Sequence, residues 1–241
     1  MEQTPSVMTG SIHELSSLFK TCLDILRNDA EHLIGDEALN ELSYFLILKQ
    51  SEKHIVSGAI NILNLDLYKD GISFKSYGKE KFQKGLECVK FSKLVEYVEN
   101  PDNKDNIKKL FDDFLWKEVL SKHPKFKDVF EDGKKSFIKE STTIKKIVIA
   151  LSSIDFNNYD YDILGEAYES IFVDAVFGAG GNKKSELGQF FTPPKVKKLL
   201  VTLVNPKLKD NGEIESVLDP ASGTGGILNT IIKQFEKSNH K

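Results

Sequence analysis

The sequence is poor in arginine and cysteine. Arg27 is the only arginine among the 241 residues, so bidentate readout of guanine by arginine is essentially excluded. The two cysteines, Cys22 and Cys88, lie in amphipathic stretches. They predict buried free thiols in a reducing compartment rather than a disulfide framework. The five histidines show no metal-ligand spacing, which predicts that the chain holds no metal.

Long apolar runs and a secretion signal are also lacking. No run approaches the ~18 residues needed to cross a membrane, and residues 1–5 lack the basic-then-apolar pattern of a signal peptide. These absences predict a cytoplasmic protein with no membrane partner. With 241 residues, 40% of them hydrophobic, the chain is long enough to bury one domain and part of another. Its net charge of −3 argues against a globally basic nucleic-acid coat.

Helical periodicity dominates about the first 150 residues. Apolar residues recur at helical spacing in the stretches 12–26, 39–46, 82–94, 107–115 and 144–151. These stripes predict amphipathic helices that share a core, and Trp116 is interpreted as a packing residue rather than a base-stacking platform. The stretch 71–78 alternates weakly, which favours a hairpin strand or an extended loop.

The periodicity breaks over residues 155–162, a polar run typical of a linker that closes on an Asp helix cap. We therefore predict a mainly α-helical domain over residues 1–156 and a second domain over residues 157–241. In the second domain, Thr192 predicts an N-cap followed by Pro193 in the first helical position. The residues predicted to form the buried face of this helix, before Asn205–Pro206 stops it, are Val196, Leu199, Leu200 and Leu203.

The stretch 217–228 reads Val-Leu-Asp-Pro-Ala-Ser-Gly-Thr-Gly-Gly-Ile-Leu. It predicts a short buried strand, a tight turn and the start of a helix. Gly223 and Gly225 have no Cβ, and the N–H groups of the helix point to the same place, which favours a nucleotide-like ligand against the backbone. A phosphate-binding P-loop is excluded, because Ile227 and Leu228 stand where it needs Lys and Ser or Thr. A dinucleotide site and an ordinary strand-to-helix turn stay open.

A second motif lies upstream, Gly-Gln-Phe-Phe-Thr-Pro-Pro at residues 188–194. Followed by Asp-Pro-Ala-Ser-Gly-Thr-Gly-Gly at residues 219–226, it closely resembles the DNA adenine-N6 methyltransferases, in particular the modification subunit of type I restriction-modification systems. The resemblance is sharpest over about residues 160–232, where residues 162–169 also look like the helix that precedes the pocket in that family. It implies that the second domain begins an α/β, Rossmann-like methyltransferase fold with an incomplete sheet.

The resemblance also implies an S-adenosylmethionine pocket. In relatives the threonine of the first motif contacts the methionine part of the cofactor, and the neighbouring aromatic residues help to wall the pocket. Asp219 would lie near the cofactor's ammonium group, and the glycines would let the cofactor approach the backbone. The implied cofactor-binding residues are Phe190, Phe191, Thr192, Pro193, Asp219, Pro220, Ala221, Ser222, Gly223, Thr224, Gly225 and Gly226.

Lysine is concentrated ahead of the glycine-bearing turn. Between residues 175 and 210 the acidic residues are Asp210 and Glu186, and the lysines are Lys183, Lys184, Lys195, Lys197, Lys198, Lys207 and Lys209. This local basic face is compatible with a phosphate backbone, and a solvated helix face is the alternative interpretation. The resemblance implies DNA, a specificity subunit and a restriction subunit as partners.

Adenine-N6 methylation in this family depends on an Asn- or Asp-Pro-Pro-aromatic tetrapeptide that holds the flipped base. This sequence lacks it, since Asn100–Pro101 and Asn205–Pro206 are followed by Asp102 and Lys207. We therefore predict the front part of a methyltransferase subunit, with no catalytic residue of its own and no activity alone. A complementing C-terminal methyltransferase chain is a further candidate partner. The alternative is a non-catalytic module whose helical half binds DNA or a partner subunit.

Overall fold

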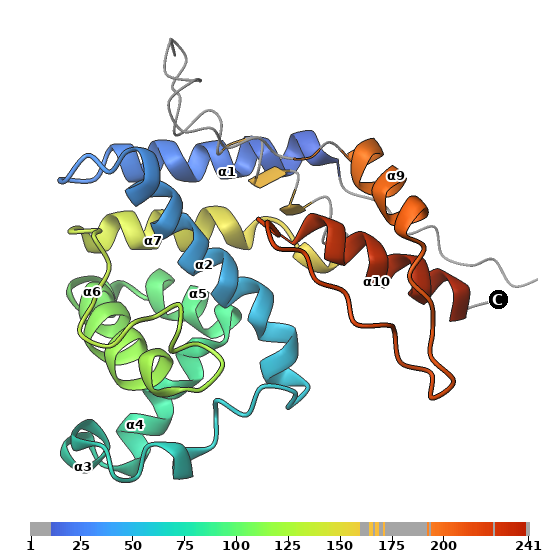
Figure 1. Cartoon of the computed structure of the whole chain (residues 1–241). Coiled ribbons are helices and arrows are strands. Elements are labelled where there is room, and N and C mark those ends of the chain that lie inside the picture. The colour runs from blue at the N-terminus through green and yellow to red at the C-terminus, as the bar shows by residue number, and fades with distance from the viewer. Residues whose placement is uncertain are drawn as a thin grey trace, which may run out of the picture.

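The computed structural model describes residues 11–159, 164–165, 167–168, 171, 192, 194–223 and 225–239. These residues are mainly helical (Figure 1). The helices are α1 Ile12–Arg27, α2 Gly35–Val56, α3 Ile72–Tyr77, α4 Lys79–Leu86, α5 Phe91–Glu99, α6 Ile107–Lys109, α7 Ser141–Ser152, α9 Pro194–Val204 and α10 Gly226–Asn239. α6 continues as a π-helix, Leu110–Val119. None of the helices in these ranges combines the length and apolar character that a membrane span requires.

α1 shows how the sequence pattern sets a helix. Its N-cap is Ser11, whose hydroxyl oxygen accepts a hydrogen bond from the Glu14 N–H at 3.2 Å. One face of α1 packs against α2 and α7. The buried residues of that face are Leu15, Phe19, Cys22, Leu23 and Leu26. The helix predicted over residues 12–26 is therefore confirmed, and both cysteines are buried free thiols, as predicted.

The interior of the helical domain is one contiguous apolar cluster. α7 lies alongside α1 and α5 (Figure 1), and its predicted inward residues, Ile144, Ile147, Val148 and Leu151, are fully buried. Trp116 in the π-helix packs edge-on against Tyr44 and Phe130, with ring centroids 4.6 and 5.0 Å away. The interpretation of Trp116 as a packing residue is confirmed.

The same core continues past residue 157. Leu164, Ala167 and Ile171 are buried in the cluster formed by the helices. The Tyr168 hydroxyl lies 2.8 Å from the Ser43 hydroxyl on α2. This part of the chain is thus anchored on the helical domain, while the domain boundary at residue 156 stays a prediction.

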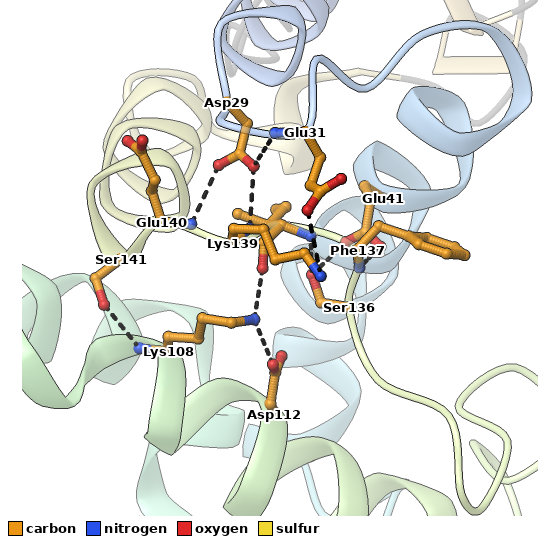
Figure 2. A network of polar contacts seen from close by, with 11 residues as sticks. Asp29, Glu31, Glu41, Lys108, Asp112, Ser136, Phe137, Lys139, Glu140 and Ser141 are labelled. Atoms are coloured by element: carbon orange, nitrogen blue, oxygen red, sulfur yellow. Dashed lines mark hydrogen bonds and ion pairs between the residues drawn. The ribbon is translucent and has the colours of Figure 1, made fainter.

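Two buried carboxylates hold the segment 136–141 onto α1 and α2 (Figure 2). Asp29, just after α1, accepts hydrogen bonds from the N–H groups of Lys139 at 3.0 Å and Glu140 at 3.2 Å. Glu41, on α2, accepts one from the Phe137 N–H at 2.7 Å and another from the Ser136 hydroxyl at 2.7 Å. Both acidic side chains are fully buried.

Lys108 joins the π-helix to the same segment (Figure 2). Its Nζ donates to the Asp112 carboxylate and to the Ile138 carbonyl oxygen. Its backbone N–H donates to the Ser141 hydroxyl at 3.3 Å. The Asp112 Oδ1 atom is buried and has no hydrogen-bond partner among the described residues. The segment 136–141 is therefore tied by polar contacts to the loop after α1, to α2 and to α6.

The three carboxylates of this network titrate differently. Burial raises the pKa of Glu41 to about 7 and also raises the pKa of Asp112, because a low-dielectric interior disfavours the charged form. Burial also acts upward on Asp29, but hydrogen bonds from Lys139, Thr143, Glu140 and Glu31 outweigh it and lower the pKa of Asp29 below its ordinary value. Asp29 is thus a stabilising anion, whereas ionising Glu41 costs stability.

The stretch 71–78 does not form the predicted hairpin strand or extended loop. Residues 72–77 form α3, which packs against α4. An isolated two-stranded hairpin is marginal in water unless more strands or a helix cover it. Residues 11–159 contain no strand that could pair with it, so helical packing prevails over the weak alternation.

α9 ends where predicted, but its predicted inward face is wrong. Asn205 has φ 48° and its N–H donates to the Val201 carbonyl at 2.9 Å, before Pro206 stops the helix. Val201 is 1% exposed, so α9 buries a different side from the one predicted. The exposed side chains are Val196 at 42%, Leu199 at 56%, Leu200 at 39% and Leu203 at 71%. The prediction rested on the apolar stripe alone, and the described residues do not cover that stripe.

The buried strand predicted at residues 217–218 is also absent. Val217 is 37% exposed and Leu218 is 87% exposed. Among the described residues the β-type pairing is confined to an isolated antiparallel bridge between Leu208 and Ile214. A parallel strand buries its side chains only between neighbouring strands and covering helices. The Rossmann-like start of a sheet is accordingly not seen.

Candidate cofactor site

Asp219 forms the base of the turn before α10. Its Oδ1 atom accepts a hydrogen bond from the Ala221 N–H at 3.1 Å, which closes a short side-chain-to-backbone turn. Its Oδ2 atom is buried and has no hydrogen-bond partner among the described residues. A buried carboxylate oxygen without a partner costs free energy, so this atom is suited to a donor or a cation from a ligand.

The glycines of the turn adopt the conformation that the predicted ligand site requires. Gly223 has φ 51° and Gly225 has φ 76°, the left-handed region that other residues rarely enter. The Gly225 N–H donates to the Ser222 carbonyl at 2.7 Å, and the Asn229 N–H donates to the Gly225 carbonyl at 2.9 Å as α10 begins. A Cβ on Gly223 or Gly225 would meet no atom within 4 Å. The space beside the backbone is therefore open at both glycines.

α9, which follows the first sequence motif, packs against α10, which follows the second (Figure 1). A Cβ on Gly226, the first residue of α10, would lie 2.6 Å from Nζ and 2.9 Å from Cε of Lys197 in α9. Gly226 thus lets the Lys197 side chain lie against the start of α10. The helix that follows Thr192 therefore lies beside the start of α10.

Not every predicted cofactor residue lies in the described part of the chain. The described ones are Thr192, Asp219, Pro220, Ala221, Ser222, Gly223, Gly225 and Gly226. Those outside it are Phe190, Phe191, Pro193 and Thr224. Thr192 is half-buried. Cofactor binding by this set stays a prediction.

Sequence reasoning missed the position of Lys197. It counted Lys197 with the basic face, but the side chain is half-buried against the glycine-bearing turn, whereas its neighbours Lys195 and Lys198 are exposed. The sequence feature that could have indicated this contact is Gly226. A third glycine, beyond the two in the turn, indicates that another group lies close to the backbone there. That signal does not name the approaching residue.

Comparisons with known proteins agree with both motifs. The sequence model of the N-6 DNA methylase family matches residues 159–241. The methylase subunit of the type I restriction enzyme EcoEI from Escherichia coli is 30% identical over 226 residues, which cover 89% of this chain and 40% of the relative. The MjaVIII methylase subunit from Methanocaldococcus jannaschii is 35% identical over 85 residues, 35% of this chain and 13% of the relative.

The matched part of the chain spans less than half the length of these curated relatives. No solved structure matches it. The EcoEI subunit is similar across the helical domain as well as the motif region, since the matched part includes most of this chain. With α9 packed against α10, these similarities show that residues 159–241 match the N-6 DNA methylase family and that the chain is similar to methylase subunits of type I restriction enzymes.

Proposed function

We propose that this chain supplies the first part of the S-adenosylmethionine site of a DNA adenine-N6 methyltransferase of the type I restriction-modification class. The observation that carries the proposal is the buried Asp219 Oδ2 atom, which has no hydrogen-bond partner in the described part of the chain, in a turn with two left-handed glycines. A cationic ammonium group would satisfy that oxygen, and the open space at Gly223 and Gly225 would admit the rest of the ligand.

Four of the described cofactor residues have a distinct task in this proposal. Asp219 binds the amino group of the cofactor, and the backbone of Gly223 and Gly225 lies against its methionine and adenosine parts. Thr192, ahead of α9, contacts the methionine part. The cofactor, when bound, supplies the methyl group on its sulfonium centre. Lys197 packs from α9 against Gly226 at the start of α10.

Calorimetric titration of S-adenosylmethionine into the 241-residue chain tests this site. We expect Asp219→Ala to weaken binding roughly thirtyfold, because a charge-assisted hydrogen bond contributes about 2 kcal/mol. Gly223→Ala is expected to weaken it as well, since the added methyl group enters the open space and strains φ 51°.

Matched controls are available in the short hairpin that precedes the turn. Gly212 also has a positive φ, 82°, and a Cβ there would likewise meet no atom within 4 Å. Asp210 is exposed. Gly212→Ala and Asp210→Ala should leave cofactor affinity unchanged. Equal affinity in all four variants, or no heat at millimolar cofactor, would rule out this site.

We further propose that the 241-residue chain alone does not transfer the methyl group. The sequence contains no Asn- or Asp-Pro-Pro-aromatic tetrapeptide to hold an extrahelical adenine. The expected result is no incorporation of labelled methyl groups into adenine-containing DNA by the purified chain, even where the cofactor binds. Incorporation above that of a heat-treated sample would contradict this proposal.

The partners of the chain follow from the same proposal. Its complex contains DNA, a specificity subunit that reads the target, and a restriction subunit. The exposed apolar face of α9, with Leu203 at 71% and Leu199 at 56% exposure, supports burial against the remaining methyltransferase sheet, supplied by whichever polypeptide carries it. The alternative, a non-catalytic module that binds DNA or a partner subunit, is favoured by the same exposed face if no cofactor binds.

A further inference from the structure

A cavity lies in the helical domain, away from the glycine-bearing turn. It has a volume of about 620 Å³ and is formed by residues between Tyr77 and Phe114. α4 and α5 contribute to it, and they are separated from α9 and α10 in Figure 1. Sites for small ligands have volumes of roughly 300–1,000 Å³. The cavity is therefore large enough for a nucleotide and contains no residue of the candidate cofactor site.

Aromatic rings form the apolar part of this cavity. Phe114 is 7% exposed and packs edge-on against Phe82, with ring centroids 4.9 Å apart. The Tyr77 ring lies 6.0 Å from Phe114. Gly85 makes this arrangement possible, since a Cβ there would lie 2.7 Å from the Phe114 ring. The Tyr77 and Phe114 rings are tilted by 49°, and Tyr77 is the more exposed of the two at 37%, so the Tyr77 ring is the surface on which a planar base can stack.

Positive charge is in excess around the same cavity. Its two glutamates, Glu87 and Glu96, are each paired with a lysine, Lys90 and Lys93 respectively.

The remaining lysines of the cavity are Lys81, Lys84 and Lys109. Lys81 Nζ lies 5.3 Å from the centre of the Tyr77 ring. Lys84 and Lys109 are exposed and have no ion pair among the described residues. Three amino groups without a carboxylate partner at one cavity favour an anionic ligand.

Three asparagines add hydrogen-bonding capacity to the cavity. The Asn103 amide N–H donates to the Tyr97 carbonyl at 3.0 Å, which leaves its side-chain oxygen as an acceptor. The Asn100 side-chain oxygen accepts the Asp102 N–H at 3.0 Å, which leaves its amide N–H groups as donors. Asn106 is exposed. Donors and acceptors together suit the edge of a nucleobase.

We propose that this cavity binds a nucleoside phosphate. The base stacks on the exposed Tyr77 ring beside Phe114, the asparagine amides contact its edge, and the phosphate binds Lys84 and Lys109. The ligand is a free nucleotide or one nucleotide unit of a nucleic acid strand, which present the same groups. This site is additional to the cofactor site, and it does not depend on Asp219 or the glycine-bearing turn.

Calorimetric titration of AMP into the 241-residue chain tests the proposal. We expect the double variant Lys84→Gln/Lys109→Gln to bind AMP roughly tenfold more weakly, because two charged contacts to the phosphate are lost. The matched control, Lys20→Gln/Lys146→Gln, replaces two exposed lysines outside the cavity and should bind AMP unchanged. Asp219→Ala should also bind AMP unchanged, which separates this cavity from the cofactor site.

Two further titrants identify the source of the nucleotide. Adenosine, which lacks the phosphate, is expected to bind at least tenfold more weakly than AMP. A single-stranded deoxyadenylate hexamer that binds more tightly than AMP, and is weakened by the cavity variant, would show that the ligand is a strand. The proposal fails if AMP and the hexamer give no heat at millimolar concentration, or if the cavity and control variants respond alike.

Discussion

Replacing Asp29 with alanine is expected to lower the free energy of unfolding by about 4 kcal/mol, because the change leaves buried N–H groups without an acceptor. Asp29 is 0% exposed, and its carboxylate accepts hydrogen bonds from the N–H groups of Lys139, Glu140 and Glu31. Its lowered pKa means that the folded chain favours the carboxylate. The loss should be measured by urea denaturation at pH 7.

Two companion variants make this result interpretable. Asp29→Asn keeps one acceptor oxygen and places an amide N–H against a backbone N–H, so its loss should be intermediate. Asp128→Ala removes an exposed acidic residue and should change stability by less than about 0.5 kcal/mol. Equal stability of Asp29→Ala and Asp128→Ala would contradict the anchoring role of Asp29.

The stability supplied by Asp29 also depends on pH. Because the pKa of Asp29 is lowered on folding, its contribution is present above the unfolded-state pKa and is lost as the pH falls through the folded-state value. The difference between wild type and Asp29→Ala should therefore shrink in acid.

Local patterns predicted the helical half of the chain, and distant contacts did not follow from them. α1 and α7 were predictable because their apolar stripes, and in α1 its Ser11 cap, lie within one segment. The buried carboxylates were not predictable, because Ser136 lies 95 residues from Glu41 and Lys139 lies 110 residues from Asp29. An acidic residue at an amphipathic helix normally faces solvent.

In the candidate cofactor site, too, local features could be predicted from the sequence and packing between helices could not. The turn at Gly223 and Gly225 follows from residue type, since glycine is the residue that adopts positive φ without strain. The approach of Lys197 to Gly226 depends on how α9 packs against α10, which one sequence does not specify. The buried side of α9 was predicted wrongly, because an apolar stripe shows which residues favour burial but not which part of the protein would bury them.

Glu41→Gln is expected to remove a pH dependence from the stability of the helical domain. Burial raises the pKa of Glu41 to about 7 from an ordinary value of 4.5. A raised pKa means that the folded state favours the proton, so the contribution of Glu41 is fully present below pH 4.5 and is lost as the pH rises through about 7. The ionised carboxylate then costs the folded chain about 3 kcal/mol.

Glutamine retains most of the contacts without the charge. Its oxygen can accept the Phe137 N–H, and its amide can donate to the Ser136 hydroxyl, which also accepts the Ile138 N–H at 3.1 Å. Below pH 5 the variant should match wild type or be about 1 kcal/mol less stable. Above pH 7.5 it should be the more stable protein. Thermal unfolding followed by circular dichroism from pH 4.5 to 8.5 measures both limits.

Neighbouring charges also shift the pKa of Glu41, so they bear on whether the test identifies Glu41 as the titrating group. Asp112 raises the pKa of Glu41 and Lys108 lowers it, and both act less strongly than burial. Since Asp112 and Lys108 remain in the variant, a flattened profile in Glu41→Gln identifies Glu41 as the titrating group. Glu37→Gln, an exposed change in the same helix, should keep the wild-type slope. If Glu41→Gln also kept the wild-type slope, the prediction would be wrong. The Glu41 carboxylate would then ionise in the folded chain at little cost in stability, because its buried contacts to residues 136–137 stabilise the charge.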